Sequence, residues 1–265
     1  MKSRVKIIFV DIDWTILDHS KFPAEFDLIS IEALKNCQRN GIKVFLCSAR
    51  PFYSIKQVKM LDLFSPDGII CSNGGLIIYN DEIIYRTYVE KDDFVKLCKL
   101  AEKYGANVEG IRPYDCFISN DNYEDILAVH STYPEEMPPI EDYHNQDVLG
   151  VGLFAKEEYD EIFKKELPNL KYYFRFHPNG VDIANEIHDK GESVKFVLNY
   201  LKINKNESAS FGDDLQDITM FEQTGYSFAM DNAKEEAKKA AKYITKSVSS
   251  NGVAHALNKL AKGDI

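Results

Sequence analysis

The sequence predicts an α/β protein whose parallel sheet is interrupted by an α+β insert. In residues 1–79, short apolar runs alternate with helical patterns, and the same alternation resumes in residues 187–265. Between these flanks, in residues 80–186, strand patterns predominate over helical ones. We therefore expect the two flanks to build one core with right-handed crossovers, and the middle segment to form a separate cap.

The first flank opens with the run Val5–Val10, which is short, apolar and rich in β-branched residues, as in a buried strand. Ser30 is the predicted cap of the next helix, and Pro51 suits the first turn of the one after it. The expected elements are a strand at 5–10, a helix from Ser30 to Asn40, a strand at 42–46, a helix at 51–61 and a strand at 69–71.

The insert opens with a hairpin signal, because Asn80-Asp81 separates two apolar runs. Two or three helices are expected among its strands. The strand at 76–79 ends the first flank. Within the insert, the expected strands lie at 83–88, 108–111, 116–119, 148–154 and 172–176, and the helices at 92–104, after Asp121, and at 157–166.

The second flank restores the alternation of helix and strand. Helices are expected at 192–201, after the strand at 208–211, from Ala233 and from Asn251, with further strands at 226–230 and 243–245.

Composition excludes several classes of protein. The formal net charge of −10, with no clustered Lys/Arg to offset it, argues against nucleic acid and against an anionic membrane surface as partners. The first apolar run is too short for a signal peptide, and no stretch reaches the length of a transmembrane helix. The five cysteines are scattered without a CxxC pair, so neither a zinc site nor a disulfide framework is indicated. We expect a cytoplasmic protein with reduced thiols.

Polar side chains suited to phosphate chemistry follow four separate predicted strands. They are Asp11, Asp13 and Thr15; Ser48 and Arg50; Asn73; and Asp213 and Asp217. Each group has an ordinary explanation when taken alone, since Asp and Ser cap turns and helices and a lone Lys190 would be a surface residue. The carboxyl ends of parallel strands share one edge of a sheet, so we expect these side chains to converge on one site.

In this order along the chain, the motifs resemble those of the haloacid dehalogenase superfamily, specifically the Cof-type phosphatases of subfamily IIB with a C2-type cap. The matching segments are Asp11-Ile12-Asp13-Trp14-Thr15, Ser48 within Cys47-Ser48-Ala49-Arg50, Lys190-Gly191, Gly212-Asp213 with Asp217, and Ser72-Asn73-Gly74-Gly75. The resemblance covers both flanks, whereas the insert matches only in position, length and strand content. It implies a Rossmann-like core and a cap that selects the substrate.

The resemblance also implies a role for each residue. Asp11 would attack phosphorus to give an aspartyl-phosphate, and Asp13 would act as acid and then as base. Mg²⁺ would bind Asp11, Asp13 and Asp213, with Asp217 as a further candidate. Ser48 and Lys190 would contact the phosphoryl group. The residues that would contact the rest of the substrate are Thr15, Arg50, Asn73, Gly74 and Gln216.

Four positions depart from the usual pattern of this subgroup. Ser48-Ala49 stands in place of threonine-glycine and Gln216 in place of asparagine, and both changes keep the chemical groups. Trp14 stands in place of glycine and adds an indole beside the acids. It either packs beneath the insert or borders the pocket.

The leading hypothesis is a Mg²⁺-dependent phosphatase of small phosphorylated metabolites, with sugar phosphates as the favoured class. A phosphomutase of the same superfamily is the alternative enzyme. Two alternatives that are not enzymes stay open: a receiver-like sensing module and a catalytically silent binding protein. A homodimer stays open as the oligomeric state.

Overall fold

A sheet of eight strands forms the centre of the first of two units in this computed structural model. The structure describes residues 5–121, 138–177, 179–185, 187 and 189–265. The first unit comprises residues 1–49, 61–84 and 189–265, and the second comprises residues 50–60 and 85–188. The fold class predicted from the sequence, a mainly parallel α/β sheet with a second α+β part, is confirmed.

The strands of the first sheet run in the order β15-β14-β13-β1-β4-β5-β6-β7. Their bounds are β1 Ile7–Val10, β4 Lys43–Cys47, β5 Gly68–Cys71, β6 Leu76–Tyr79, β7 Glu82–Arg86, β13 Ser208–Gly212, β14 Tyr226–Ala229 and β15 Tyr243–Ile244. The neighbours from β15 to β5 are parallel, and β6 returns antiparallel to β5. Every residue of β1 and β13 is buried, as expected for central strands covered on both faces.

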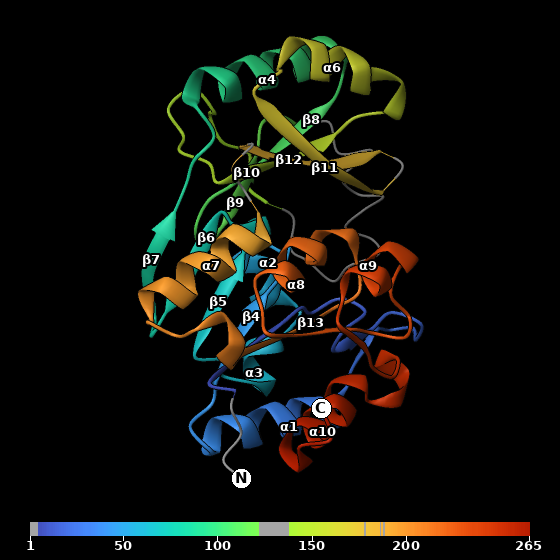
Figure 1. Ribbon diagram of the computed structural model, residues 1–265. Coiled ribbons are helices and arrows are strands. Elements are labelled where there is room, and N and C mark those ends of the chain that lie inside the picture. The colour runs from blue at the N-terminus through green and yellow to red at the C-terminus, as the bar shows by residue number, and fades with distance from the viewer. Residues whose placement is uncertain (1–4, 122–137, 178, 186, 188) are drawn as a thin grey trace. The chain divides into compact units, whose positions relative to one another are not determined.

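Helices and short turns connect these strands, with the small ribbon β2 Leu17–Asp18 and β3 Glu25–Phe26 beside them. The helical elements are α1 Leu28–Arg39, α3 Met60–Leu63, α7 Lys190–Tyr200, α8 Ile218–Glu222, α9 Glu235–Ala240 and α10 Gly252–Lys262, with 3-10 turns η1 Ser72–Gly74, η3 Lys205–Glu207, η4 Leu215–Asp217 and η5 Val248–Ser250. α1 and α10 lie side by side (Figure 1) and are joined by a hydrogen bond from the Ala254 N–H to the Ser30 hydroxyl.

Two predicted helices differ from the structure. Asp27, not Ser30, caps α1, because its carboxylate accepts the Ser30 N–H while the Ser30 hydroxyl is used by α10. The helix expected at 51–61 is divided into α2 Phe52–Gln57 and α3, because Lys59 adopts a left-handed conformation with φ of 59° that ends the first helix.

The second unit is built on an antiparallel sheet in the order β11-β12-β10-β8-β9. The bounds are β8 Asn107–Ile111, β9 Cys116–Ile118, β10 Gly150–Phe154, β11 Leu170–His177 and β12 Gly180–Asn185, with helices α4 Lys91–Lys103 and α6 Asp160–Glu166 and the turn η2 Glu157–Tyr159. β12 was not predicted from the sequence, and the short helix expected after Asp121 lies outside the described residues.

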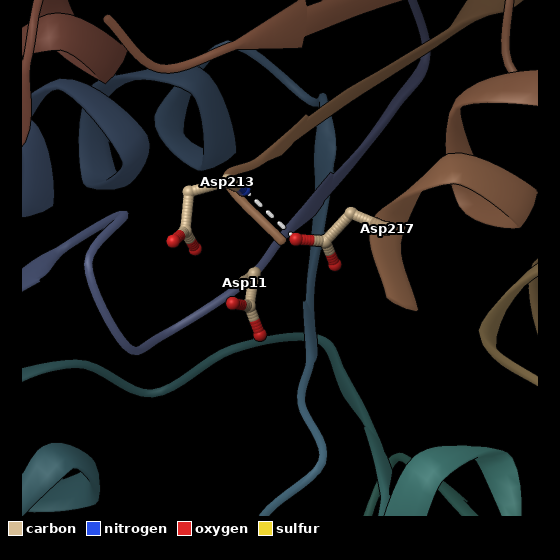
Figure 2. Close-up of side chains that lie close together, drawn as sticks. All are labelled: Asp11, Asp213 and Asp217. Carbon is tan, nitrogen blue, oxygen red and sulfur yellow. Dashed lines mark hydrogen bonds between the residues drawn. The ribbon is translucent and has the colours of Figure 1, made fainter. Parts of the chain in front are cut away.

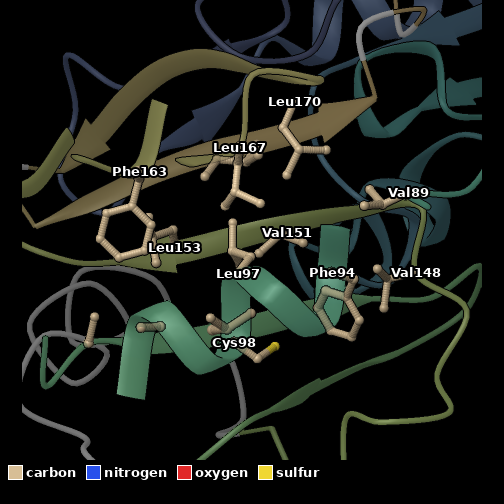
Figure 3. Close-up of a cluster of buried hydrophobic side chains, with 14 of the residues drawn as sticks. Val89, Phe94, Leu97, Cys98, Val148, Val151, Leu153, Phe163, Leu167 and Leu170 are labelled. Atoms are coloured by element: carbon tan, nitrogen blue, oxygen red, sulfur yellow. The ribbon is translucent and has the colours of Figure 1, made fainter. Parts of the chain in front are cut away.

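One face of this second sheet carries the hydrophobic core of the unit. Figure 3 shows Phe94 and Leu97 of α4 and Phe163 of α6 against Val151 and Leu153 of β10. Since side chains alternate along a strand, the register places Glu109, Gly152 and Asp182 in a row on the opposite face. This face therefore combines two acidic side chains with a glycine between them.

In the described part of the chain, no helix has the length and apolar character needed to cross a membrane.

Candidate active site

Two aspartates lie together where the central strands of the first sheet end. Asp11 follows β1 directly and Asp213 follows β13, and these two strands are parallel neighbours. Figure 2 shows their carboxylates close to that of Asp217, which ends the turn η4. One carboxylate oxygen from each of the three residues lies within 4.8 Å of the others. Of the side chains expected to converge at this edge of the sheet, these three aspartates do so.

Lys190 supplies a positive charge to this group. It is the first residue of α7, where the Asp189 side chain caps the helix by accepting two backbone N–H groups. Its Nζ donates hydrogen bonds to Asp11 Oδ1 at 2.9 Å and to Asp217 Oδ1 at 2.7 Å. All three side chains of this ion-paired set are less than one-tenth exposed. Removing Lys190 would leave the two buried carboxylates without their common counter-charge.

Asp217 is fixed by the loop that follows β13. Its Oδ2 accepts the backbone N–H groups of Asp213 and Asp214 at 2.8 and 3.0 Å, while Oδ1 accepts from Lys190. Gly212 permits this contact, since a Cβ there would lie 2.4 Å from Asp217 Cγ. Both oxygens of Asp217 are thus engaged in holding the loop and the lysine.

Burial and charge crowding perturb the protonation of this group. Burial raises the pKa of Asp11, and the carboxylates of Asp217 and Asp13 raise it further, against the lowering effect of Lys190. Burial, followed by Asp217 and Asp11, also raises the pKa of Asp213. Burial disfavours the charged lysine, but Asp11 and Asp217 outweigh it and raise the pKa of Lys190. The cluster has three acids and one lysine, and this excess of buried negative charge favours a further cation.

The donor set fits a hard divalent cation. Asp11 and Asp213 offer carboxylate oxygens, and Mg²⁺ prefers a small number of such ligands completed by water and phosphate. No histidine or cysteine belongs to this three-residue group, so its chemistry differs from that of sites suited to zinc. Asp11 and Asp213 are better placed to bind the ion than Asp217, whose oxygens already accept three hydrogen bonds.

Asp13 lies two residues beyond Asp11 and forms a contact that the sequence analysis missed. Its Oδ1 is 2.6 Å from His19 Nε2, and its side chain is 31% exposed. The His19 ring in turn lies against the indole of Trp14. The only signal in the sequence was a histidine shortly after the acids, and its relevance depends on the tight turn in which the Trp14 N–H donates to the Leu17 carbonyl.

The other predicted residues of the first unit lie at or near strand ends. Thr15 is buried, and its hydroxyl is 3.4 Å from Asp213 Oδ1. Ser48 is buried directly after β4, and its backbone N–H donates to the Ile70 carbonyl of β5. The Gly74 carbonyl accepts from Ser193 of α7, next to the helix start that carries Lys190.

Two predicted substrate-binding residues carry buried polar atoms without a hydrogen-bond partner among the described residues. They are Asn73, whose Oδ1 is buried and whose φ is 54°, and Gln216, whose Oε1 is buried. A buried acceptor without a donor is unfavourable unless a ligand or water supplies one. Arg50 belongs to the second unit, where its guanidinium donates to the Ser54 hydroxyl at 2.8 Å.

Comparison with known proteins finds relatives over almost the whole chain. "Putative phosphatase YkrA" of Bacillus subtilis is 28% identical over 264 residues, which are 96% of this chain and 97% of that protein. "Phosphoglycolate phosphatase 1" of Saccharolobus solfataricus is 28% identical over 260 residues, which are 98% of this chain and 97% of that protein.

Among solved structures, the fold is shared with the protein described as the HAD subclass IIB sugar phosphatase BT4131. Its TM-score is 0.81 at 23% identity, with 98% of this chain and all of that chain covered. A protein of Geobacillus kaustophilus with no stated activity gives a TM-score of 0.89 at 26% identity, with 97% of this chain and 99% of that chain covered.

The family model described as haloacid dehalogenase-like hydrolase matches residues 8–257, a range that includes Asp11, Lys190, Asp213 and Asp217. The chain belongs to the haloacid dehalogenase-like hydrolase family.

Proposed function

We propose that this phosphatase of the haloacid dehalogenase-like family hydrolyses small phosphorylated metabolites, with sugar phosphates as the substrate class, and that it requires Mg²⁺. The observation that carries the proposal is the buried set of Asp11, Asp213 and Asp217 around Lys190 at the carboxyl edge of the sheet. Phosphoryl transfer depends mainly on positioning and on neutralising charge, and this set supplies both.

In the proposed reaction, a carboxylate oxygen of Asp11 attacks phosphorus while the bond from phosphorus to the leaving oxygen breaks. The leaving oxygen takes a proton from the Asp13 carboxyl group, so that an alcohol departs. The Asp13 carboxylate then takes a proton from water, the water oxygen attacks phosphorus, and the bond to Asp11 breaks. Inorganic phosphate is released, and both aspartates return to their starting states.

Lys190 has two roles in this scheme. It holds Asp11 Oδ1 through the 2.9 Å hydrogen bond, which orients the nucleophile. It also offsets charge on the phosphoryl oxygens, together with the Ser48 hydroxyl. Asp217 keeps the ammonium group in place through its 2.7 Å contact.

Mg²⁺ would be held by Asp11 and Asp213 with the Asp13 backbone carbonyl, and Asp217 beside them. When bound, it would neutralise phosphoryl charge. The Thr15 hydroxyl, 3.4 Å from Asp213, helps to orient that carboxylate. Asn73 and Gln216 have buried oxygen atoms to offer to substrate hydroxyl groups, and Gly74 and Arg50 complete the substrate-side candidates.

The test measures inorganic phosphate released from a panel of phosphate esters with and without Mg²⁺. The wild type should release phosphate only with the metal, and Asp11→Asn should lower the rate by at least ~10³-fold. Asp62→Asn, the same change at an exposed position of α3, should behave as wild type. Activity of Asp11→Asn equal to that of the wild type would contradict the mechanism, and transfer of phosphate between substrate positions without release would indicate a mutase.

A further inference from the structure

We propose that Trp14, with His19 beside it, forms an aromatic surface that selects substrates whose leaving group carries a ring. This inference rests on the proposed function, because it takes Asp13 as the group that protonates the leaving oxygen. Its own evidence is the conformation and surroundings of Trp14.

The backbone of Trp14 lies in a region that favours glycine. Its φ is 55°, and left-handed conformations are costly for bulky side chains. The turn enforces this conformation, since the Trp14 N–H donates to the Leu17 carbonyl and the Trp14 carbonyl accepts from Asn232 Nδ2 at 2.9 Å. A glycine would satisfy both hydrogen bonds without strain, so the fold itself does not explain the indole.

Packing does not explain the indole either. Trp14 is 41% exposed. The other apolar side chains of the Ile12–Leu17 turn are fully or almost fully buried. Two-fifths of this side chain stays open to solvent on a strained backbone, so packing uses only part of the ring. An outlier of this kind next to reacting groups points to a functional role.

The position of the ring indicates what it would contact. Trp14 adjoins Asp13 in sequence, and its ring centroid is 5.4 Å from that of His19, whose Nε2 is 2.6 Å from Asp13 Oδ1. A leaving oxygen that receives a proton from Asp13 must lie within hydrogen-bond distance of it. The carbon atoms attached to that oxygen would then lie near the His19 ring and the Trp14 ring that packs on it. The two rings are inclined to each other by 46°, and each presents an aromatic face.

The face of an aromatic ring gains most from a partner that also presents a flat, apolar face. Pyranose rings present such a face through their C–H groups, and aromatic rings do so through their π faces. Short acyclic leaving groups such as glycolate present neither. The shared chemistry is therefore a six-membered ring on or near the ester oxygen.

The kinetic test compares ring-bearing and acyclic esters in Trp14→Gly, Trp14→Phe and wild-type protein. The esters are glucose 6-phosphate, phenyl phosphate, glycerol phosphate and phosphoglycolate. Trp14→Gly should lower kcat/KM for the ring-bearing esters roughly 3- to 10-fold, and for the acyclic esters less than about 2-fold. Trp14→Phe should retain most of the discrimination. The loss of kcat/KM in Trp14→Gly is then compared between glucose 6-phosphate and phenyl phosphate, and the larger loss shows which kind of ring is preferred.

Stability is measured in parallel, because glycine suits the left-handed backbone at this position. The Tm of Trp14→Gly should equal or exceed that of the wild type, which separates the kinetic effect from unfolding. Phe22→Ala, at a fully exposed aromatic residue nearby in the sequence, is the matched control and should change no rate. Equal losses of kcat/KM for all four esters in Trp14→Gly, or no loss for the ring-bearing esters, would refute the selective role of Trp14.

A second readout works without turnover. Trp14 is the only tryptophan of the chain, so intrinsic fluorescence reports on this ring alone. In Asp11→Asn with Mg²⁺, ring-bearing esters should change the fluorescence intensity or wavelength, and glycerol phosphate should change it less. If the wild type releases phosphate from no ester, the proposed function fails, and this titration still decides whether Trp14 binds rings. Identical responses to all four esters would count against it.

Discussion

Each unit of the molecule contains a group of acidic side chains, and the two groups are neutralised differently. In the first unit, Asp11, Asp213 and Asp217 surround Lys190, and we call these four residues the lysine cluster. In the second unit, Glu109 of β8 and Asp182 of β12 flank Gly152 of β10, and we call these three residues the glycine-spaced row. The lysine cluster lies beyond strand ends, whereas the row lies in the middle of its strands.

The difference is one of counter-charge. In the lysine cluster, an ammonium group binds two of the carboxylates directly. In the described part of the chain Asp182 forms no ion pair, and burial, followed by the charge of Glu109, raises the pKa of Asp182 to about 7. A proton can therefore neutralise Asp182 near neutral pH. The pKa values of Asp11 and Asp213 are raised as well, so the lysine cluster differs from the row in its fixed ammonium group rather than in its capacity to hold a proton.

The largest effect is expected for Lys190→Met. This change leaves Asp11 and Asp217 buried without their common partner, and breaking a buried ion pair from one side costs about 3–5 kcal/mol. The free energy of unfolding, measured by urea titration, should fall by this amount, and phosphatase activity should be lost.

The matched control is Lys195→Met on the same helix. Lys195 forms an exposed ion pair with Glu192, and such pairs contribute little, about 0.5 kcal/mol or less. If the two methionine variants were equally stable, Lys190 would not be the counter-charge of the lysine cluster.

Mg²⁺ should stabilise the protein through the lysine cluster alone. A ligand that binds only the folded state adds about 2.7 kcal/mol at 100 times its Kd, so Tm should rise with the metal concentration. Asp213→Asn should abolish the rise because it removes a proposed ligand. Asp182→Asn should leave it intact, since the glycine-spaced row lies on the face of another sheet. A rise in Tm that persists in Asp213→Asn would place the metal elsewhere.

Protonation of Asp182 in the glycine-spaced row should make the stability of the protein depend on pH. The pKa of Asp182 is raised from 3.8 to about 7 in the folded protein, so the folded state holds its proton more tightly than the unfolded state. The stabilising contribution of the neutral form is complete below pH 4 and is lost as the pH rises through about 7.

Asp182→Asn places a neutral side chain of similar shape where the wild type has a carboxyl group. The free energy of unfolding of the variant, relative to that of the wild type, should therefore increase between pH 4 and pH 8. Because Asp182 is half-buried, we expect a gain of about 1–2 kcal/mol rather than the full value of the shift. Urea titrations at several pH values measure it, with Asp92→Asn at the exposed start of α4 as the control. Parallel stability curves for the wild type and Asp182→Asn would mean that Asp182 is charged throughout this range.

The two groups also differ in how far the sequence predicted them. Asp11 and Asp213 could be assigned to one edge because polar residues directly follow apolar strand patterns, and parallel topology brings such positions together. Lys190 begins a helix, and only the resemblance of Lys190-Gly191 to a family motif assigned it to the site. The contact of His19 with Asp13 could not be predicted, because it depends on the exact course of a tight turn.

The glycine-spaced row was missed altogether. Asp182 lies in β12, whose pattern is short and broken by polar residues, and that strand was not predicted. Its alignment with Glu109 depends on the register of three antiparallel strands that are distant in sequence. Register is set by packing across the whole sheet, which no local pattern in this segment encodes.

The smallest effect concerns the glycine that separates the two acids of the row. A Cβ on Gly152 would lie 3.1 Å from Glu109 Oε2, so the glutamate would have to shift by a few tenths of an ångström. Tyr53 opposes that shift, because its hydroxyl donates to Glu109 Oε1 at 2.5 Å. Alanine is otherwise better than glycine within a strand by roughly 0.5–1 kcal/mol, because it loses less backbone entropy on folding.

These two contributions should nearly cancel in Gly152→Ala, so its free energy of unfolding should match that of the wild type. In a Glu109→Ala background the crowding is gone, and the same glycine-to-alanine change should then stabilise by about 0.5–1 kcal/mol. The double-mutant cycle isolates the contact between position 152 and the glutamate. A coupling energy near zero would show that Glu109 moves freely, and that the glycine in this row serves neither to admit the glutamate nor to bring the two carboxyl groups together.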